Sequence, residues 1–192
     1  MIKDLVKKNR SCRGYDRSRK VKRKELLDMV DCARLCASSV NKQPLKYFVT
    51  AEREIADKIT AHVQFGAMLA ELHLPLKDTE PPAYIVICQD TSINPVERSV
   101  LKDVGIAAQT ITLRAAEMGL SSCMIGAFRQ EDIGKLLFLP DGVKAVLIIA
   151  IGKSIEKAKI VEIDNGEDTA YYREEDGTHC VPKRKLEDVI LN

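Results

Sequence analysis

Two arginine residues flank a serine close to the N-terminus. Arg10, Ser11 and Arg13 place two guanidinium groups and one hydroxyl group within a stretch of four residues. A guanidinium group binds phosphate oxygens through paired, charge-assisted hydrogen bonds. This segment is therefore a candidate site for a phosphorylated ligand.

Two other loops carry side chains that suit the same kind of ligand. Loop 37–44 is polar, and it includes Ser38, Ser39 and Asn41. Their hydroxyl and amide groups can bind the edge of a heterocycle or a polyol chain. Residues 183–185 add three cations near the C-terminus. Two basic segments and one neutral polar loop together favour a ligand with a phosphate group and a polar ring.

Other well-known site patterns are missing. Gly152, Lys153 and Ser154 resemble the end of a phosphate-binding P-loop, but Leu147 stands where that motif needs a glycine. No GxGxxG motif follows an expected strand, which argues against a Rossmann nucleotide fold. The six cysteines form no CxxC pair and the three histidines have no zinc-ligand spacing. We therefore expect the cysteines to be structural and expect no metal site.

The composition predicts one globular domain that spans residues 1–192. Hydrophobic residues make up 45% of the chain and charged residues 30%, with a net charge of +2. The longest apolar run, residues 145–151, is far shorter than the ~20 residues of a membrane-spanning helix. The N-terminus lacks the apolar segment of a signal peptide. We expect a cytoplasmic protein without membrane contact.

The small net charge hides an uneven distribution. Residues 1–24 carry eleven Lys and Arg against two Asp, and acidic residues gather in segment 162–176. Such asymmetry indicates an anionic partner, although residues 17–24 are expected mainly to coat a solvated surface. Aromatic residues are only 5% of the chain, whereas proteins that bind single-stranded nucleic acid interleave aromatic and basic residues. A small phosphorylated cofactor is thus favoured over nucleic acid.

Apolar spacing predicts alternating helices and strands that could position these loops. We expect helices at about 22–36, 52–63, 98–118 and 130–138, and strands at 45–51, 83–89, 120–125 and 143–151. The unbroken apolar stripe and the alanines of helix 98–118 indicate a buried central helix. Segment 64–82 gives mixed signals, segment 162–176 is expected to be irregular, and residues 186–191 to form a helical turn. The pattern predicts an α+β or α/β domain whose long polar tail lies on a second subunit.

Five segments in order along the chain resemble the nitroreductase family of FMN-dependent oxidoreductases. They are residues 10–15 (Arg-Ser-Cys-Arg-Gly-Tyr), 37–44 (Ala-Ser-Ser-Val-Asn-Lys-Gln-Pro), 103–109 running on to Gly119 and Leu120, 125–126 (Ile-Gly) and 182–186 (Pro-Lys-Arg-Lys-Leu). Each motif is weak alone, but their order over nearly the whole chain is specific.

The resemblance implies a fold and an activity. The fold would be α+β, with a central mixed, mainly antiparallel sheet flanked by helices, a long central interface helix and a C-terminal extension over the partner subunit. A homodimer would hold FMN at the subunit interface. NADH or NADPH would reduce the flavin, and a nitroaromatic, quinone or similar electron-poor acceptor would then reoxidise it by ping-pong two-electron transfer.

The resemblance also implies roles for individual residues. Arg10, Ser11 and Arg13 would contact the FMN phosphate, ribityl chain and pyrimidine edge, and Lys183 and Lys185 would complete the phosphate site. Ser38, Ser39 and Asn41 would reach FMN from the opposite subunit, and the backbone N–H groups of Ile125 and Gly126 would face flavin N5 and O4. No side chain is implied as a catalytic acid, nucleophile or metal ligand.

Departures from the family pattern leave the acceptor open. Ala37 stands where a proline is common, Leu45 where a tryptophan is common, and segment 64–77 is short. Two alternatives remain at this stage. The protein could reduce a different acceptor, such as an enone or a halogenated aromatic, or it could be a flavin-binding sensor or sequestering module without turnover.

Overall fold

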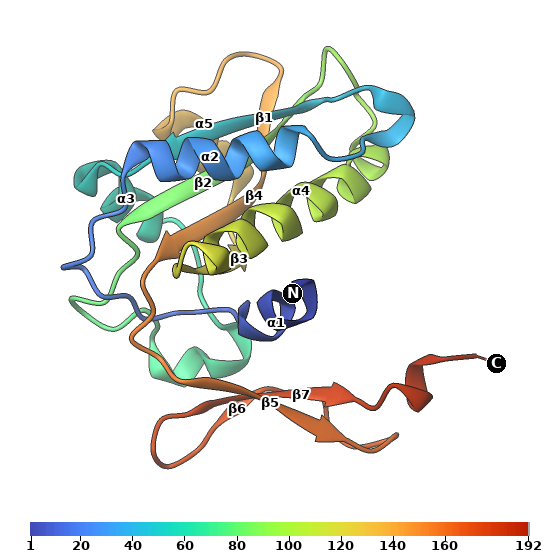
Figure 1. Cartoon of the computed structure of the whole chain (residues 1–192). Coiled ribbons are helices and arrows are strands. Elements are labelled where there is room, and N and C mark those ends of the chain that lie inside the picture. Colours follow the sequence, from blue (N-terminus) through green and yellow to red (C-terminus); the bar gives the residue numbers. More distant parts are fainter. Residues whose placement is uncertain (192) are drawn as a thin grey trace.

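The computed structural model describes residues 1–191, without the side chains of Ala67, Met68, Ala70 and Glu97. Its centre is a four-stranded antiparallel sheet in the order β1-β2-β4-β3 (Figure 1). The strands are β1 (Leu45–Thr50), β2 (Ala83–Asp90), β3 (Ser121–Ile125) and β4 (Val143–Gly152). All four were predicted within two residues of these bounds.

The two central strands are apolar on both faces because helices cover both faces of the sheet. In β2, Ala83 to Gln89 are all buried, and β4 is buried from Ile148 to Gly152. The register pairs Ile85 with Ile149 and shifts by one residue after Ile87. A continuous apolar run is the pattern expected of a strand buried on two sides.

Four helices form the covering layers. Helices α2 (Arg23–Arg34) and α4 (Glu97–Glu117) pack on one face through a core that includes Leu26 and Ile111. Helices α3 (Arg53–Thr60) and α5 (Gln130–Leu136) pack on the other face, around Ile133. These helices confirm the predicted ones, and α4 is the long central helix. Gly119, with a φ of 73°, follows its C-terminus, as expected for a helix-ending glycine.

A short N-terminal helix was not predicted. Helix α1 (Ile2–Lys8) lies beside α4, and the Asn9 side chain after it donates a 2.8 Å hydrogen bond to Thr112 Oγ1. None of its residues is buried. Because α1 buries no apolar stripe, its sequence carries no clear helical periodicity.

The C-terminal segment forms a second sheet that was not predicted, although segment 162–176 is irregular apart from residues 162–163 and 172–173. Strand β5 (Ala158–Ile163) pairs in parallel with β7 (His179–Arg184), and β6 (Tyr172–Arg173) pairs with β7 from the other side. This second sheet lies below α1 in Figure 1. A 3-10 turn, η3 (Glu187–Val189), confirms the predicted final turn.

Two more 3-10 segments lie in loops, at η1 (Ser39–Asn41) and η2 (Ala67–Leu72). Segment 64–82, which gave mixed signals, contains η2 and is otherwise irregular. Among residues 1–191, no helix is both long and apolar enough to cross a membrane.

Candidate functional site

Residues 10–15, here called the Arg10 segment, border a hollow of about 370 Å³, here called the Arg10 hollow. The segment follows α1 and runs alongside β3, where the backbone N–H of Cys12 donates to the Ser122 carbonyl at 2.9 Å. The lining residues are Lys7, Lys8, Arg10, Ser11, Cys12, Ser121, Ser154, Glu156 and Ala158. The structure therefore places Arg10 and Ser11 at this hollow together with Lys7 and Lys8, whereas Arg13 lines a separate hollow of about 270 Å³.

Arg10 has a hydrogen-bond donor that none of the described residues uses. One terminal nitrogen, Nη2, donates to the Val6 carbonyl at 2.6 Å. The Nε–H group is buried and has no acceptor among the described residues. Burial lowers the pKa of Arg10, but a guanidinium group stays charged at neutral pH. A buried cationic donor beside a hollow suits an anionic ligand, since an unpaired buried donor is costly.

Lys7 and Lys8 line the same hollow and were not assigned to the site from the sequence. They belong to the basic N-terminal segment, which the charge count did single out. Their position beside Arg10 could not be predicted, because α1 itself was not predicted. In the last turn of a helix, both side chains also lie near the negative end of its dipole.

Arg13 is buried, with only 6% of its surface exposed. Its backbone N–H donates to Glu156 Oε2 at 2.7 Å, and its Nη1 lies 3.2 Å from His179 Nε2. The guanidinium carbon lies 4.7 Å from the ring centre of Tyr171. Its Nε–H, like that of Arg10, has no acceptor among the described residues. Arg13 is thus not a surface ion-pair partner.

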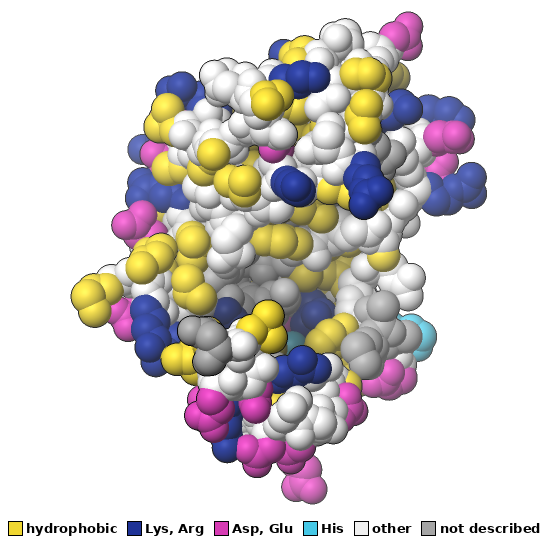
Figure 2. Space-filling model, turned by 90° about the vertical axis from the view of Figure 1, so that its right-hand side faces the viewer, with side chains coloured by type: hydrophobic (Ala, Val, Ile, Leu, Met, Phe, Trp, Pro, Cys, Tyr) yellow, Lys and Arg dark blue, Asp and Glu magenta, His cyan; other side chains and the backbone are white. Residues whose placement is uncertain are grey.

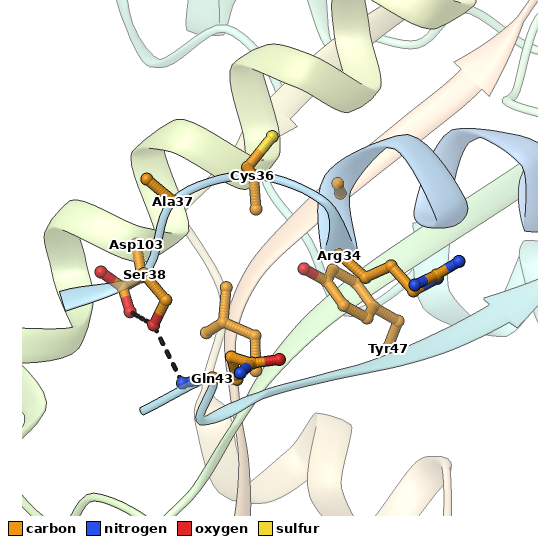
Figure 3. A pocket seen from close by; sticks show the side chains of 10 residues that line it. Arg34, Cys36, Ala37, Ser38, Gln43, Tyr47 and Asp103 are labelled. Carbon is orange, nitrogen blue, oxygen red and sulfur yellow. Dashed lines mark hydrogen bonds between the residues drawn. The ribbon is translucent and has the colours of Figure 1, made fainter. Parts of the chain in front are cut away.

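Residues 37–44, here called the Ser38 loop, lie beside the N-terminal half of α4 (Figure 3). The Ser38 hydroxyl donates to Asp103 Oδ2 at 2.6 Å, and the Ser39 backbone N–H donates to Asp103 Oδ1 at 2.9 Å. The Ser38 oxygen in turn accepts the backbone N–H of Gln43 at 2.9 Å. Asp103 is buried on α4, so its carboxylate fixes the shape of this loop.

These contacts divide the three predicted residues of the loop by role. The Ser38 hydroxyl is committed to the loop itself, whereas Ser39 and Asn41 are exposed. Asn41 and its neighbour Val40 have positive φ angles of 54° and 46°. Such angles are costly for residues other than glycine and persist where surrounding contacts hold them. The loop therefore presents Ser39 and Asn41 outward on a constrained backbone.

The Ser38 loop and the Arg10 segment lie apart within one chain. A hollow of about 150 Å³ that Ser38 lines shares no lining residue with the Arg10 hollow among the described residues. Asp103 binds the Ser38 loop, and Thr112 binds Asn9, which directly precedes the Arg10 segment. These two residues are nine positions apart on α4. At 1.5 Å per residue this is roughly 13 Å along the helix axis.

Ile125 and Gly126 lie where β3 ends. Ile125 is buried and pairs with Ile148, and Gly126 is exposed just beyond the strand. A Cβ atom added to Gly126 would meet no atom within 4 Å. The backbone at this position is therefore open to a neighbouring group.

The two predicted C-terminal lysines do not line the Arg10 hollow. Lys183 is exposed on β7, opposite Glu162 in the register. The Lys185 ammonium group forms an ion pair with Asp164. Within one chain, the cations beside Arg10 come from α1 and not from β7.

The six cysteines are free thiols. Burial raises the pKa of Cys12 and Cys88 to about 12 and that of Cys123 to about 11. Cys180 is buried as well, and Cys32 and Cys36 are half-buried. A thiol with so high a pKa is protonated at neutral pH and is a poor nucleophile. These values fit the structural role that was predicted for the cysteines.

Acidic side chains concentrate at the end of β5 and in the loops that connect the strands of the second sheet. Figure 2 shows them at the lower end of the molecule, below a hollowed part of the surface. The exposed acidic residues of this segment are Glu162, Asp164, Glu167, Asp168, Glu174, Glu175 and Asp176. The predicted charge asymmetry along the chain is thus also an asymmetry in space.

Comparison with known proteins identifies a family. Residues 6–153 match the model of the nitroreductase family. A protein of Methanothermobacter thermautotrophicus, provisionally named NADH dehydrogenase/NAD(P)H nitroreductase, is 31% identical over 81% of this chain and 78% of its own.

Solved structures agree with this match. An FMN-dependent nitroreductase from Clostridium difficile R20291 is 27% identical, with a TM-score of 0.66 over 81% of this chain and 88% of its own. A nitroreductase family protein from Streptococcus pneumoniae is 17% identical and matches over 100% of both chains with a TM-score of 0.71, which supports the fold alone.

Proposed function

The chain belongs to the nitroreductase family, whose members are oxidoreductases, and from this premise we propose that it transfers electrons from NAD(P)H to an electron-poor organic acceptor through bound FMN. The observation that carries the proposal is the pair of buried, unpaired Nε–H donors on Arg10 and Arg13. FMN, when bound, would supply hydride uptake and delivery. The protein would bind it, orient it and expose one face to both substrates.

The Arg10 hollow is the proposed phosphate site. Arg10 and Ser11 would donate to the phosphate oxygens, and Lys7 and Lys8 would add positive charge. Glu156 also lines this hollow, but it is bound by Arg173 and by the backbone of Arg13, so its charge is compensated. The donor set therefore fits a dianion.

The flavin ring is proposed to lie beside Arg13 and the end of β3. Arg13 would donate to the pyrimidine edge, and the open backbone at Gly126 would approach N5 and O4. Lys183 and Lys185 would join the phosphate site only if the C-terminal segment of a holo dimer brought them there. Their roles stay predictions.

A second copy of the chain would complete the site. Ser39 and Asn41 face outward from a loop that lies roughly 13 Å along α4 from the Arg10 segment. A homodimer related by a two-fold axis can bring this loop of one subunit to the Arg10 hollow of the other. The flavin would then lie at the interface.

Flavin binding tests the proposal directly. The purified protein is expected to bind FMN, to lose its yellow colour with NADH or NADPH, and to regain it with a nitroaromatic or quinone. Arg10→Ala should weaken FMN binding about 10- to 100-fold, because a charge-assisted hydrogen bond contributes about 1.5–3 kcal/mol. Arg53→Ala is the matched control, since Arg53 lies on α3 and pairs with Asp57 at the surface. A protein that does not bind FMN contradicts the proposal, and one that binds FMN but resists reduction by both nicotinamides is a binding module.

Mixed dimers test the shared site. Arg10→Ala and Asn41→Ala homodimers are each damaged in both sites, but a dimer with one chain of each kind has one intact site. An equal mixture after subunit exchange should regain about one quarter of wild-type activity, because half of the dimers are mixed. Activity that does not rise on mixing would show that both residues serve the same subunit's flavin.

A further inference from the structure

The second sheet contributes side chains to Arg13 although it lies outside the segment that matches the family. The match ends at residue 153, whereas Tyr171, Arg173 and His179 come from the C-terminal segment. Figure 1 shows this segment folded as a separate sheet beneath α1. Its contact with the proposed flavin site is therefore a feature of this chain that the family match does not cover.

The contacts hold the Arg13 guanidinium group from two sides. Its Nη1 lies 3.2 Å from His179 Nε2, and its carbon lies 4.7 Å from the Tyr171 ring centre. The Tyr171 and His179 rings are themselves 5.3 Å apart, at 59° to each other. Glu156 fixes the backbone of Arg13 through its Oε2 and binds Arg173 through its Oε1. His179 is almost fully buried, whereas Arg13, Glu156 and Arg173 line a hollow of about 270 Å³.

The contact requires one protonation state of His179. A guanidinium group only donates hydrogen bonds, so His179 Nε2 must accept, and the ring must be neutral with its proton on Nδ1. That Nδ1 atom is buried without a partner among the described residues. Burial and the charges of Arg13 and Arg173 lower the pKa of His179, against the opposite effect of Glu156. The neutral ring is thus the stable form at neutral pH.

We propose that neutral His179 is a positioning residue that holds Arg13 toward the pyrimidine edge of the flavin. This inference rests on the proposed function, since Arg13 acts there as a flavin ligand. Protonation of His179 would replace the hydrogen bond by repulsion between two cations. Arg13 would then be displaced, and FMN would bind more weakly as the pH falls below the ordinary histidine pKa of about 6.5.

Two substitutions at His179 separate positioning from packing. In His179→Gln, an amide oxygen can accept from Arg13 but cannot titrate. In His179→Phe, the aromatic ring can still pack on Tyr171 but offers no acceptor. FMN dissociation constants are measured for both variants and the wild type from pH 5 to 8. His62→Gln is the control, because His62 is exposed just after α3, where its Nδ1 lies 2.8 Å from the Lys58 carbonyl oxygen.

The expected results differ between the variants. At pH 7.5, His179→Phe should bind FMN about tenfold more weakly, the effect of one lost hydrogen bond to a charged group, and His179→Gln should stay within about threefold of wild type. Wild type and His62→Gln should lose affinity toward pH 5 more steeply than His179→Gln. Protonation of the FMN phosphate, with a pKa of about 6, is common to all of them and cancels in the comparison.

The failures of the two proposals are distinguishable. If the wild type does not bind FMN, the proposed function is wrong. If the wild type binds FMN and Arg13→Ala binds it as tightly, Arg13 is no flavin ligand and the positioning role is excluded. If Arg13→Ala is weakened but His179→Phe and the pH profile of His179→Gln match the wild type, only the positioning role is excluded. Urea unfolding of each variant checks that the fold persists.

Discussion

Asp103 is the residue on which the outward loop of the proposed site depends. Its buried carboxylate accepts from the Ser38 hydroxyl and from the Ser39 backbone. In the sequence, Asp103 is recognisable only as the first residue of the motif at 103–109 in the central helix. A carboxylate on a helix gives no signal, in sequence alone, of a bond to a loop some 65 residues earlier. Only the packing of α4 against that loop shows that the residue shapes it.

Asp103→Ala should therefore damage flavin binding without touching the flavin. Loss of two hydrogen bonds to a charged group would cost about 1.5–3 kcal/mol each and release the strained backbone at Val40 and Asn41. We expect FMN affinity to fall at least tenfold, which titration of flavin fluorescence measures. Asp103→Asn keeps one acceptor and should lose less. Equal FMN affinity of the wild type and Asp103→Ala would show that the loop does not need this carboxylate.

The residues of the proposed site were predictable to different degrees. Short motifs such as that of residues 10–15 identified Arg10 and Arg13 because each combines residue types that bind phosphate. The same motifs could not show that Arg13 is buried in contact with His179, because the two residues are 166 positions apart in the sequence. Nor could they show that the Ser38 hydroxyl is already used within its loop. Residue type is local information, whereas the partner of a side chain depends on the whole fold.

At the scale of elements, the four-stranded sheet was predictable and the second sheet was not. Strands β2 and β4 are continuous apolar runs, which is a strong local signal. Strand β5 has no buried residue and β6 has only two residues, so neither shows a periodic pattern. Their pairing with β7 is held by backbone hydrogen bonds between segments that are distant in sequence. Polar strands of this kind cannot be distinguished from loops by composition.

The end of β4 provides a prediction about packing. A Cβ atom at Gly152 would lie 2.7 Å from Pro82 Cδ and 2.7 Å from Tyr15 Cδ1, and Tyr15 is fully buried. Gly152→Ala should therefore lower the free energy of unfolding by about 1–3 kcal/mol, the usual cost of overpacking. Gly134→Ala is the matched control on α5, where a Cβ meets no atom within 4 Å; it should raise stability by about 0.5–1 kcal/mol. Urea unfolding measures both changes, and the same sign for both would contradict the packing explanation.

At the scale of the whole molecule, the basic side chains of the N-terminal segment include some that form ion pairs within the fold and others that line the Arg10 hollow. Arg17 pairs with Asp57 and Glu80, and Arg19 pairs with Glu25. These arginines are neutralised within the fold, which corrects the expectation that they only coat a solvated surface. The cations of α1 and Arg10 line the hollow instead. Arg17 and Arg19 are thus held in ion pairs, and the few cations that line the hollow fit one small dianion better than a long polyanion.

The exposed apolar surface of α4 points to a second copy of the chain. Leu101 is 53% exposed and Ile106 is 42% exposed. The C-terminal end adds Leu186, Val189, Ile190 and Leu191, all exposed. Large apolar side chains that gather on one helix and on a projecting segment are typical of a protein–protein interface. Both features agree with the proposed homodimer, in which the Ser38 loop, bound to Asp103 on the same helix, would reach the partner's flavin.

Association and flavin binding should consequently fail together. Leu101→Glu places a charge on the exposed face of α4, where burial in an interface would cost several kcal/mol. We expect light scattering to show a dimeric mass for the wild type and a monomeric mass for Leu101→Glu, together with lost FMN affinity. Phe138→Ser is the control, because the 91% exposed Phe138 follows α5, on the face of the sheet opposite α4. If Leu101→Glu became monomeric and still bound FMN as tightly as the wild type, each subunit would hold its flavin alone, and Ser39 and Asn41 would lose their proposed role.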